Sequence, residues 1–177
     1  MSDLFETVKG QQDIFKKVLS YIPGFSGYVE RTNRRAADKL LREQVALKYS
    51  ELAGRASRLQ KDVVDAGQVD LVDDIDNVSL KLRTLSDRIK NASYGYSGFF
   101  DAVKINEKEL AQIYSFDAAF FELGEQINHG LDTVESSVGG DGLKAAIRAV
   151  TDLARQAGET YDRRYQVLTG SAAPAGQ

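Results

Sequence analysis

The sequence predicts an all-α protein: an antiparallel up-and-down bundle of four long helices, preceded by an amphipathic helix. Apolar residues recur at spacings of three and four over most of the 177 positions, which is the period of an amphipathic helix. No segment alternates apolar and polar residues over the roughly four to eight positions of a half-buried strand. The links between the helical segments are short, and short links place consecutive helices antiparallel.

The first predicted helix covers about residues 4–22. Asp3 and Glu6 are spaced as a capping box, in which the two side chains satisfy the first free N–H groups of a helix. Projected at the helical period, the apolar residues fall on one half of the helix surface: Leu4, Phe5, Val8, Ile14, Phe15, Val18, Leu19 and Ile22.

The second and third predicted helices form a long hairpin. The second begins between Tyr28 and Arg34 and runs to Ala66, and Gly67 can end it in a left-handed cap. Both helices carry a coiled-coil rhythm of spacings of four and three. The second places Val45, Tyr49, Leu52, Ala56, Leu59, Val63 and Ala66 on its seam, and the third places Leu71, Ile75, Val78, Leu82, Leu85, Ile89 and Ala92 there.

The fourth and fifth predicted helices are joined by the turn Gly139–Gly142. Asn106 and Glu109 form a capping box at the start of the fourth. Gly124 inside it suggests close backbone packing or a kink, since glycine weakens a helix. The inward positions are Leu110, Ile113, Phe116, Phe120, Ile127, Leu131, Val134 and Val138 on the fourth helix, and Leu143, Ala146, Ile147, Val150, Leu153, Ala157, Tyr161 and Leu168 on the fifth.

We therefore expect one bundle domain over residues 1–169 and a disordered tail over 170–177. The chain has no cysteine, which excludes disulfides and sulfur-ligated zinc, and its one histidine excludes a two-histidine metal site. A net charge of −3 argues against nucleic-acid binding. No run approaches the about 20 apolar residues of a membrane span, and early charges interrupt any signal peptide. We expect a cytoplasmic protein.

One end of the predicted bundle gathers aromatic residues and arginines. Two links that share this end, 24–28 and 95–99, repeat the pattern Gly-aromatic-Ser-Gly-aromatic. The repeat is recurrent turn chemistry, the trace of a duplicated helical hairpin, or a site made of two similar loops. The opposite end collects aspartates, so the molecule should be electrically polarised along its length. Tyrosine and arginine anchor many protein interfaces. The predicted partner-binding residues are Phe25, Tyr28, Arg31, Arg35, Lys39, Arg42, Tyr94, Tyr96, Phe99, Phe100, Arg163, Arg164 and Tyr165.

Enzymatic chemistry finds little support in the sequence. Nucleophile elbows and phosphate loops follow a strand, and none is predicted. Ser26 and Ser97 have no histidine or lysine nearby that could activate them. Glu122, Glu125 and His129 lie close together on the fourth helix, but a di-metal bundle needs two Glu-x-x-His motifs. We predict no enzyme, no metal ligand and no cofactor, and keep a metal or small-molecule site in the bundle as a third hypothesis.

The first helix offers an alternative in which the protein binds anionic lipid at the membrane periphery. The membrane-binding residues would be Leu4, Phe5, Val8, Phe15, Val18 and Leu19. Lys9, Lys16 and Lys17 border the apolar face, as interfacial helices prefer, although the polar face has no net positive charge. An amphipathic helix ahead of a long hairpin is similar in arrangement to the phage-shock protein A family. The resemblance is one of element order and carries over no residue.

The sequence thus favours a non-enzymatic interaction or scaffold protein whose aromatic and arginine-rich end contacts a protein partner. Peripheral lipid binding through the first helix is the alternative. The regular seams could also continue between two chains, so a homodimer stays open, whereas nucleic acid is not an expected partner.

Overall fold

The computed structural model describes residues 16–18, 20–22, 34–92 and 107–169. Within these ranges the chain is helical and contains no strand, which confirms the predicted all-α class. The elements in order are α3 (Arg34–Asp65), the short 3₁₀ helix η1 (Val69–Leu71), α4 (Val72–Asn91), α6 (Glu107–Ser137) and α7 (Leu143–Thr169).

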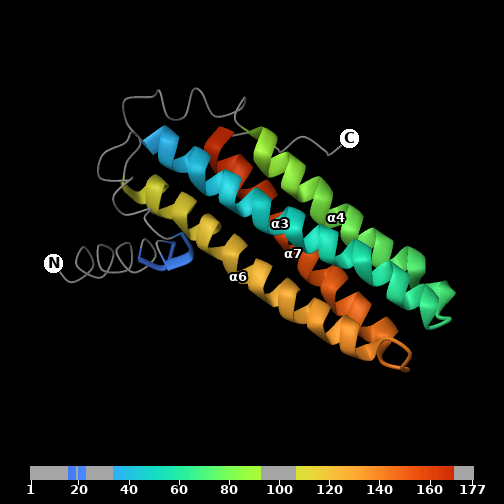
Figure 1. Cartoon of the computed structure of the whole chain (residues 1–177). Coiled ribbons are helices and arrows are strands. Elements are labelled where there is room, and N and C mark those ends of the chain that lie inside the picture. The colour runs from blue at the N-terminus through green and yellow to red at the C-terminus, as the bar shows by residue number, and fades with distance from the viewer. Residues whose placement is uncertain (1–15, 19, 23–33, 93–106, 170–177) are drawn as a thin grey trace.

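The four long helices form an antiparallel up-and-down bundle (Figure 1). α3 lies beside α4 and α6, and α7 lies beside the same two helices on the other side. The α3–α4 and α6–α7 turns therefore share one end, which we call the turn end. The N-termini of α3 and α6 and the C-termini of α4 and α7 share the other, which we call the open end.

Glycine shapes both turns, as the sequence predicted for Gly67. Gly67 and Gly139 have φ values of 77° and 81°, in the left-handed region that glycine adopts without strain. At the end of α3 the N–H of Gly67 donates to the Val64 carbonyl and that of Gln68 donates to the Val63 carbonyl. This pair of bonds is a Schellman cap, which satisfies carbonyls at the helix C-terminus.

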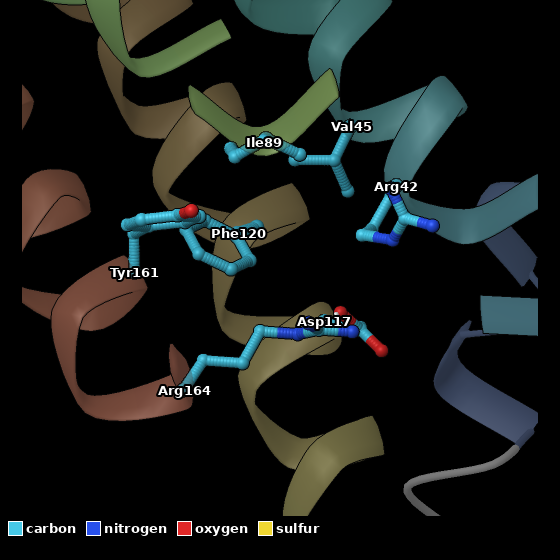
Figure 2. A pocket seen from close by; sticks show the side chains of 7 residues that line it. All are labelled: Arg42, Val45, Ile89, Asp117, Phe120, Tyr161 and Arg164. Carbon is cyan, nitrogen blue, oxygen red and sulfur yellow. Dashed lines mark hydrogen bonds and ion pairs between the residues drawn. The ribbon is translucent and has the colours of Figure 1, made fainter. Parts of the chain in front are cut away.

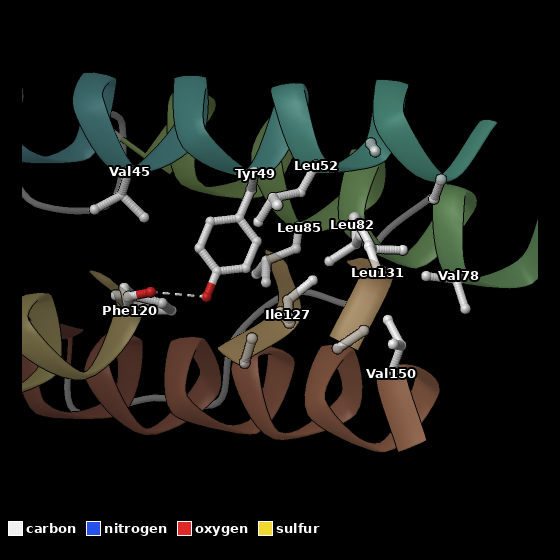
Figure 3. Close-up of a cluster of buried hydrophobic side chains, with 14 of the residues drawn as sticks. Val45, Tyr49, Leu52, Val78, Leu82, Leu85, Phe120, Ile127, Leu131 and Val150 are labelled. Atoms are coloured by element: carbon white, nitrogen blue, oxygen red, sulfur yellow. Dashed lines mark hydrogen bonds between the residues drawn. The ribbon is translucent and has the colours of Figure 1, made fainter. Parts of the chain in front are cut away.

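The bundle interior follows the predicted seams closely (Figure 3). Tyr49, Leu52, Leu82, Ile127 and their seam neighbours are buried, and the predicted inward positions Leu143 to Tyr161 of α7 are buried or half-buried. The exception on α3 is Ala66, which is exposed because the helix has ended before it. The seam of α4 extends to Ala92, directly after the helix ends.

The described part of the predicted first helix packs on the bundle. Val18 and Ile22 are 0% and 7% exposed and belong to the common core. The ring of Tyr21 stacks on Phe121 of α6 with centroids 4.8 Å apart, and the Lys17 ammonium pairs with the Glu122 carboxylate. In this conformation residues 16–18 and 20–22 pack as part of the bundle.

The start of the first helix, the Asn106 cap and the tail 170–177 lie outside the described residues. Among the described helices, none is long and apolar enough to cross a bilayer.

Candidate functional site

The most unusual feature of the interior is a layer of charged side chains near the open end. A small cavity there is lined by residues from all four long helices (Figure 2): Arg42, Val45, Ile89, Asp117, Phe120, Tyr161 and Arg164. The charged members are almost fully buried: Arg42 is 6% exposed, Asp117 1% and Arg164 2%. Ionised residues are seldom buried to this degree without compensating interactions.

An ion pair joins α6 to α7 inside this layer. Arg164 Nε donates to Asp117 Oδ1 at 3.0 Å, and each side chain is 2% exposed. Removing both charges from water costs several kcal/mol per ion, in order of magnitude, so the attraction between them must offset most of that penalty. Arg42 reaches the same cavity from α3 (Figure 2). The layer thus joins α6 to α7 through charge, and Arg42 brings a third buried charge to the same level from α3.

The cavity is small. About 10 Å³ is open to the centre of a water-sized sphere, roughly the space that one buried water molecule requires. In this conformation it has room for a species about the size of a water molecule.

A second cluster ties α4 to α7 beside the cavity. The Arg88 guanidinium lies 4.5 Å from the centroid of the Tyr161 ring, and its Nη2 donates to Asp162 Oδ1 at 2.7 Å. In return, the Tyr161 hydroxyl donates to the Arg88 carbonyl at 3.2 Å. Burial raises the pKa of Tyr161, and the positive charge of Arg88 partly opposes that shift. The phenol therefore stays a neutral donor at physiological pH.

The predicted partner-binding residues separate into two groups in the described part of the chain. Lys39 and Arg163 are exposed, and Tyr165 is half-buried with its ring 6.2 Å from that of Tyr161. Arg42 and Arg164, also predicted to contact a partner, are buried in the interior instead.

The remaining predicted partner residues lie at the start of α3 or outside the described residues. Arg35 lies in the first turn of α3. The others lie outside the described residues: Phe25, Tyr28, Arg31, Tyr94, Tyr96, Phe99 and Phe100.

The residues of the lipid-binding alternative are mostly beyond the described ranges: Leu4, Phe5, Val8, Phe15 and Leu19. Val18 is the described one, and it is fully buried in the bundle. Lipid binding through this residue would require Val18 to leave the core.

The carboxylates considered for a metal site each have another partner. Glu122 pairs with Lys17, and Glu125 pairs with Lys48 at 2.6 Å. His129 is 76% exposed, with Nδ1 3.4 Å from Asp132 Oδ2. No group of three metal-ligating side chains occurs within the described ranges.

The sequence contained a signal for the charged layer that a search for apolar residues misses. Asp117 continues the α6 seam, since it lies four positions after Ile113 and three before Phe120. Arg164 lies three positions after Tyr161 on the α7 seam, and Arg42 three before Val45 on the α3 seam. Phe116, predicted to point inward, is only half-buried because Asp117 occupies the seam position beside it.

Comparison of the chain with family models, curated proteins and solved structures gives no match.

Proposed function

We propose that this protein is a non-enzymatic helical scaffold that binds a protein partner through the open end of the bundle. The observation that supports it most is the charged layer of Arg42, Asp117 and Arg164 on the seams of three helices. Buried ion pairs rarely add stability over an apolar core, whereas polar residues at seam positions can fix helix register. We infer that the layer holds the helix ends in one fixed arrangement for recognition.

The exposed side chains at this end suit an interface. Lys39, Lys90 and Arg163 offer positive charge from three different helices, and the half-buried Tyr165 offers a ring with a polar tip. Lys39 has a neighbour in Glu43, 3.8 Å away, but both side chains are more than half exposed, so the pair is easily opened. An acidic partner surface would complement this end.

Charge reversal at matched positions tests the proposal. Lys39→Glu with Arg163→Glu changes the open end, and Lys144→Glu with Arg148→Glu makes the same change in net charge on exposed residues near the start of α7. Each variant is cross-linked in an extract of the source cells, and the captured proteins are quantified. We expect a protein captured by the wild type and by the second variant to be lost with the first.

Equal capture by all three proteins would contradict the proposal. Flotation of the full chain with anionic liposomes at low and high salt addresses the lipid alternative. If the chain floats at low salt and captures no protein, lipid binding replaces the present proposal.

A further inference from the structure

The turn end of the bundle is a single preformed surface. The side-chain amide of Gln68, between α3 and η1, bonds to the α6–α7 turn twice. Its Nε2 donates to the Gly140 carbonyl at 3.1 Å, and its Oε1 accepts from the Gly139 N–H at 2.7 Å. Two turns that are 71 residues apart in sequence are thus fastened to each other.

This surface exposes large apolar side chains within an acidic surround. Val64 is 47% exposed and Val69 is 61% exposed, and they are two of four large apolar side chains found exposed in the described part of the chain. Several exposed aspartates belong to the same turns or to the first turn of α4: Asp70, Asp73, Asp74 and Asp141. An apolar centre with a polar rim is the usual anatomy of a protein interface.

The open end carries the opposite charge. Among the described residues near this end, Lys39, Lys90 and Arg163 are exposed on α3, α4 and α7. From this complementarity we propose that the turn end docks onto the open end of a second copy of this chain. The inference rests on the proposed function, because it uses the same open end and names its partner.

Such a contact joins two different surfaces, so it is head-to-tail and does not close on itself. Each added copy presents a new turn end and a new open end, and association continues into short filaments. Because exposed charges draw the ends together, salt should weaken the contact.

The test is sedimentation velocity of the full chain over a range of concentrations. Raising NaCl shortens the Debye length from ~10 Å at about 0.1 M to ~3 Å at about 1 M. We expect dimers and longer species at low salt. At high salt the association constant should fall about tenfold or more. Val69→Ser should weaken association without changing charge, whereas Leu47→Ser, on an exposed position of the α3 side, should not.

Two end variants identify the geometry. Asp73→Lys with Asp74→Lys alters only the turn end, and Lys39→Glu with Arg163→Glu alters only the open end. Each variant alone should be monomeric, because both of its ends then carry the same charge. Their mixture should associate again, because every contact between the two variants joins ends of opposite charge. Circular dichroism confirms that both remain helical.

A wild-type chain that stays monomeric at every concentration, or a dimer that both variants retain alone, overturns the inference. The two proposals fail separately. If Asp73→Lys with Asp74→Lys leaves self-association unchanged while Lys39→Glu with Arg163→Glu loses a foreign partner, the proposed function stands and head-to-tail docking does not.

Discussion

Gly130→Ala should destabilise the protein although alanine is the better helix former. A Cβ placed on Gly130 would lie 2.6 Å from Cγ2 of Val150 on α7, well inside the usual carbon–carbon contact of about 3.5–4.0 Å. Val150 is fully buried and cannot turn into solvent. The overlap costs about 1–3 kcal/mol, and the gain in helix propensity returns only about 1 kcal/mol. We expect a net loss of about 1 kcal/mol.

Gly158→Ala is the matched control, because a Cβ there meets nothing within 4 Å. It should gain about 0.5–1 kcal/mol from helix propensity alone. Urea unfolding followed by circular dichroism measures both free energies of unfolding. Adding Val150→Ala to Gly130→Ala should recover part of the loss relative to the sum of the single changes. The reasoning fails if Gly130→Ala stabilises the protein as much as Gly158→Ala does.

Two further predictions concern buried polar groups. Asp117→Ala should lower the free energy of unfolding by about 3–5 kcal/mol, because it leaves Arg164 charged in the interior; Asp132→Ala, in an exposed ion pair, should cost far less in the same urea titration. Burial raises the pKa of Tyr49 above its ordinary value of 10.0. The contribution of the neutral phenol to the free energy of unfolding is therefore full below about pH 10. It is lost as the pH rises further, because only the unfolded chain then releases the proton. Tyr49→Phe should be less stable than the wild type by about 1 kcal/mol at neutral pH, because it lacks the hydrogen bond to the Phe120 carbonyl. Between about pH 9 and pH 11 the variant should lose less stability than the wild type. An equal loss in both proteins over this range would contradict the prediction.

The order and direction of the long helices could be predicted because they depend on local signals. The seam of α4 from Ile75 to Ile89 is buried at every predicted position, and the glycine at 67 adopts the left-handed conformation that ends a helix. Period and capping act within a few residues of the chain. Both signals can therefore be recognised in a single sequence without any knowledge of the partner helices.

The glycines inside α6 show where local signals stop. Gly124 suggests close backbone packing or a kink, but a Cβ there would touch Lys48 Cγ at 3.4 Å, in a flexible side chain that can shift. The tight approach is at Gly130 instead, against Val150. A glycine in a helix indicates that another part of the chain can approach the helix backbone closely. Which helix comes near, and how closely, depends on the register of a partner from elsewhere in the chain.

The charged layer extends this argument to the candidate site. Arg42, Asp117 and Arg164 each continue a seam, so the period alone would have placed them inside. From the sequence alone, Arg42 and Arg164 are assigned to a partner surface and Asp117 is given no role, although a single charge on a seam is costly by itself. Its cost falls only when charges on other helices arrive at the same level, as Asp117 and Arg164 do at 3.0 Å. It follows that a charged residue at a seam position should be counted as part of the seam when the buried face of a helix is predicted. Opposite charges that fall at the same level on neighbouring helices then predict a buried layer, and with it the register that the open end requires.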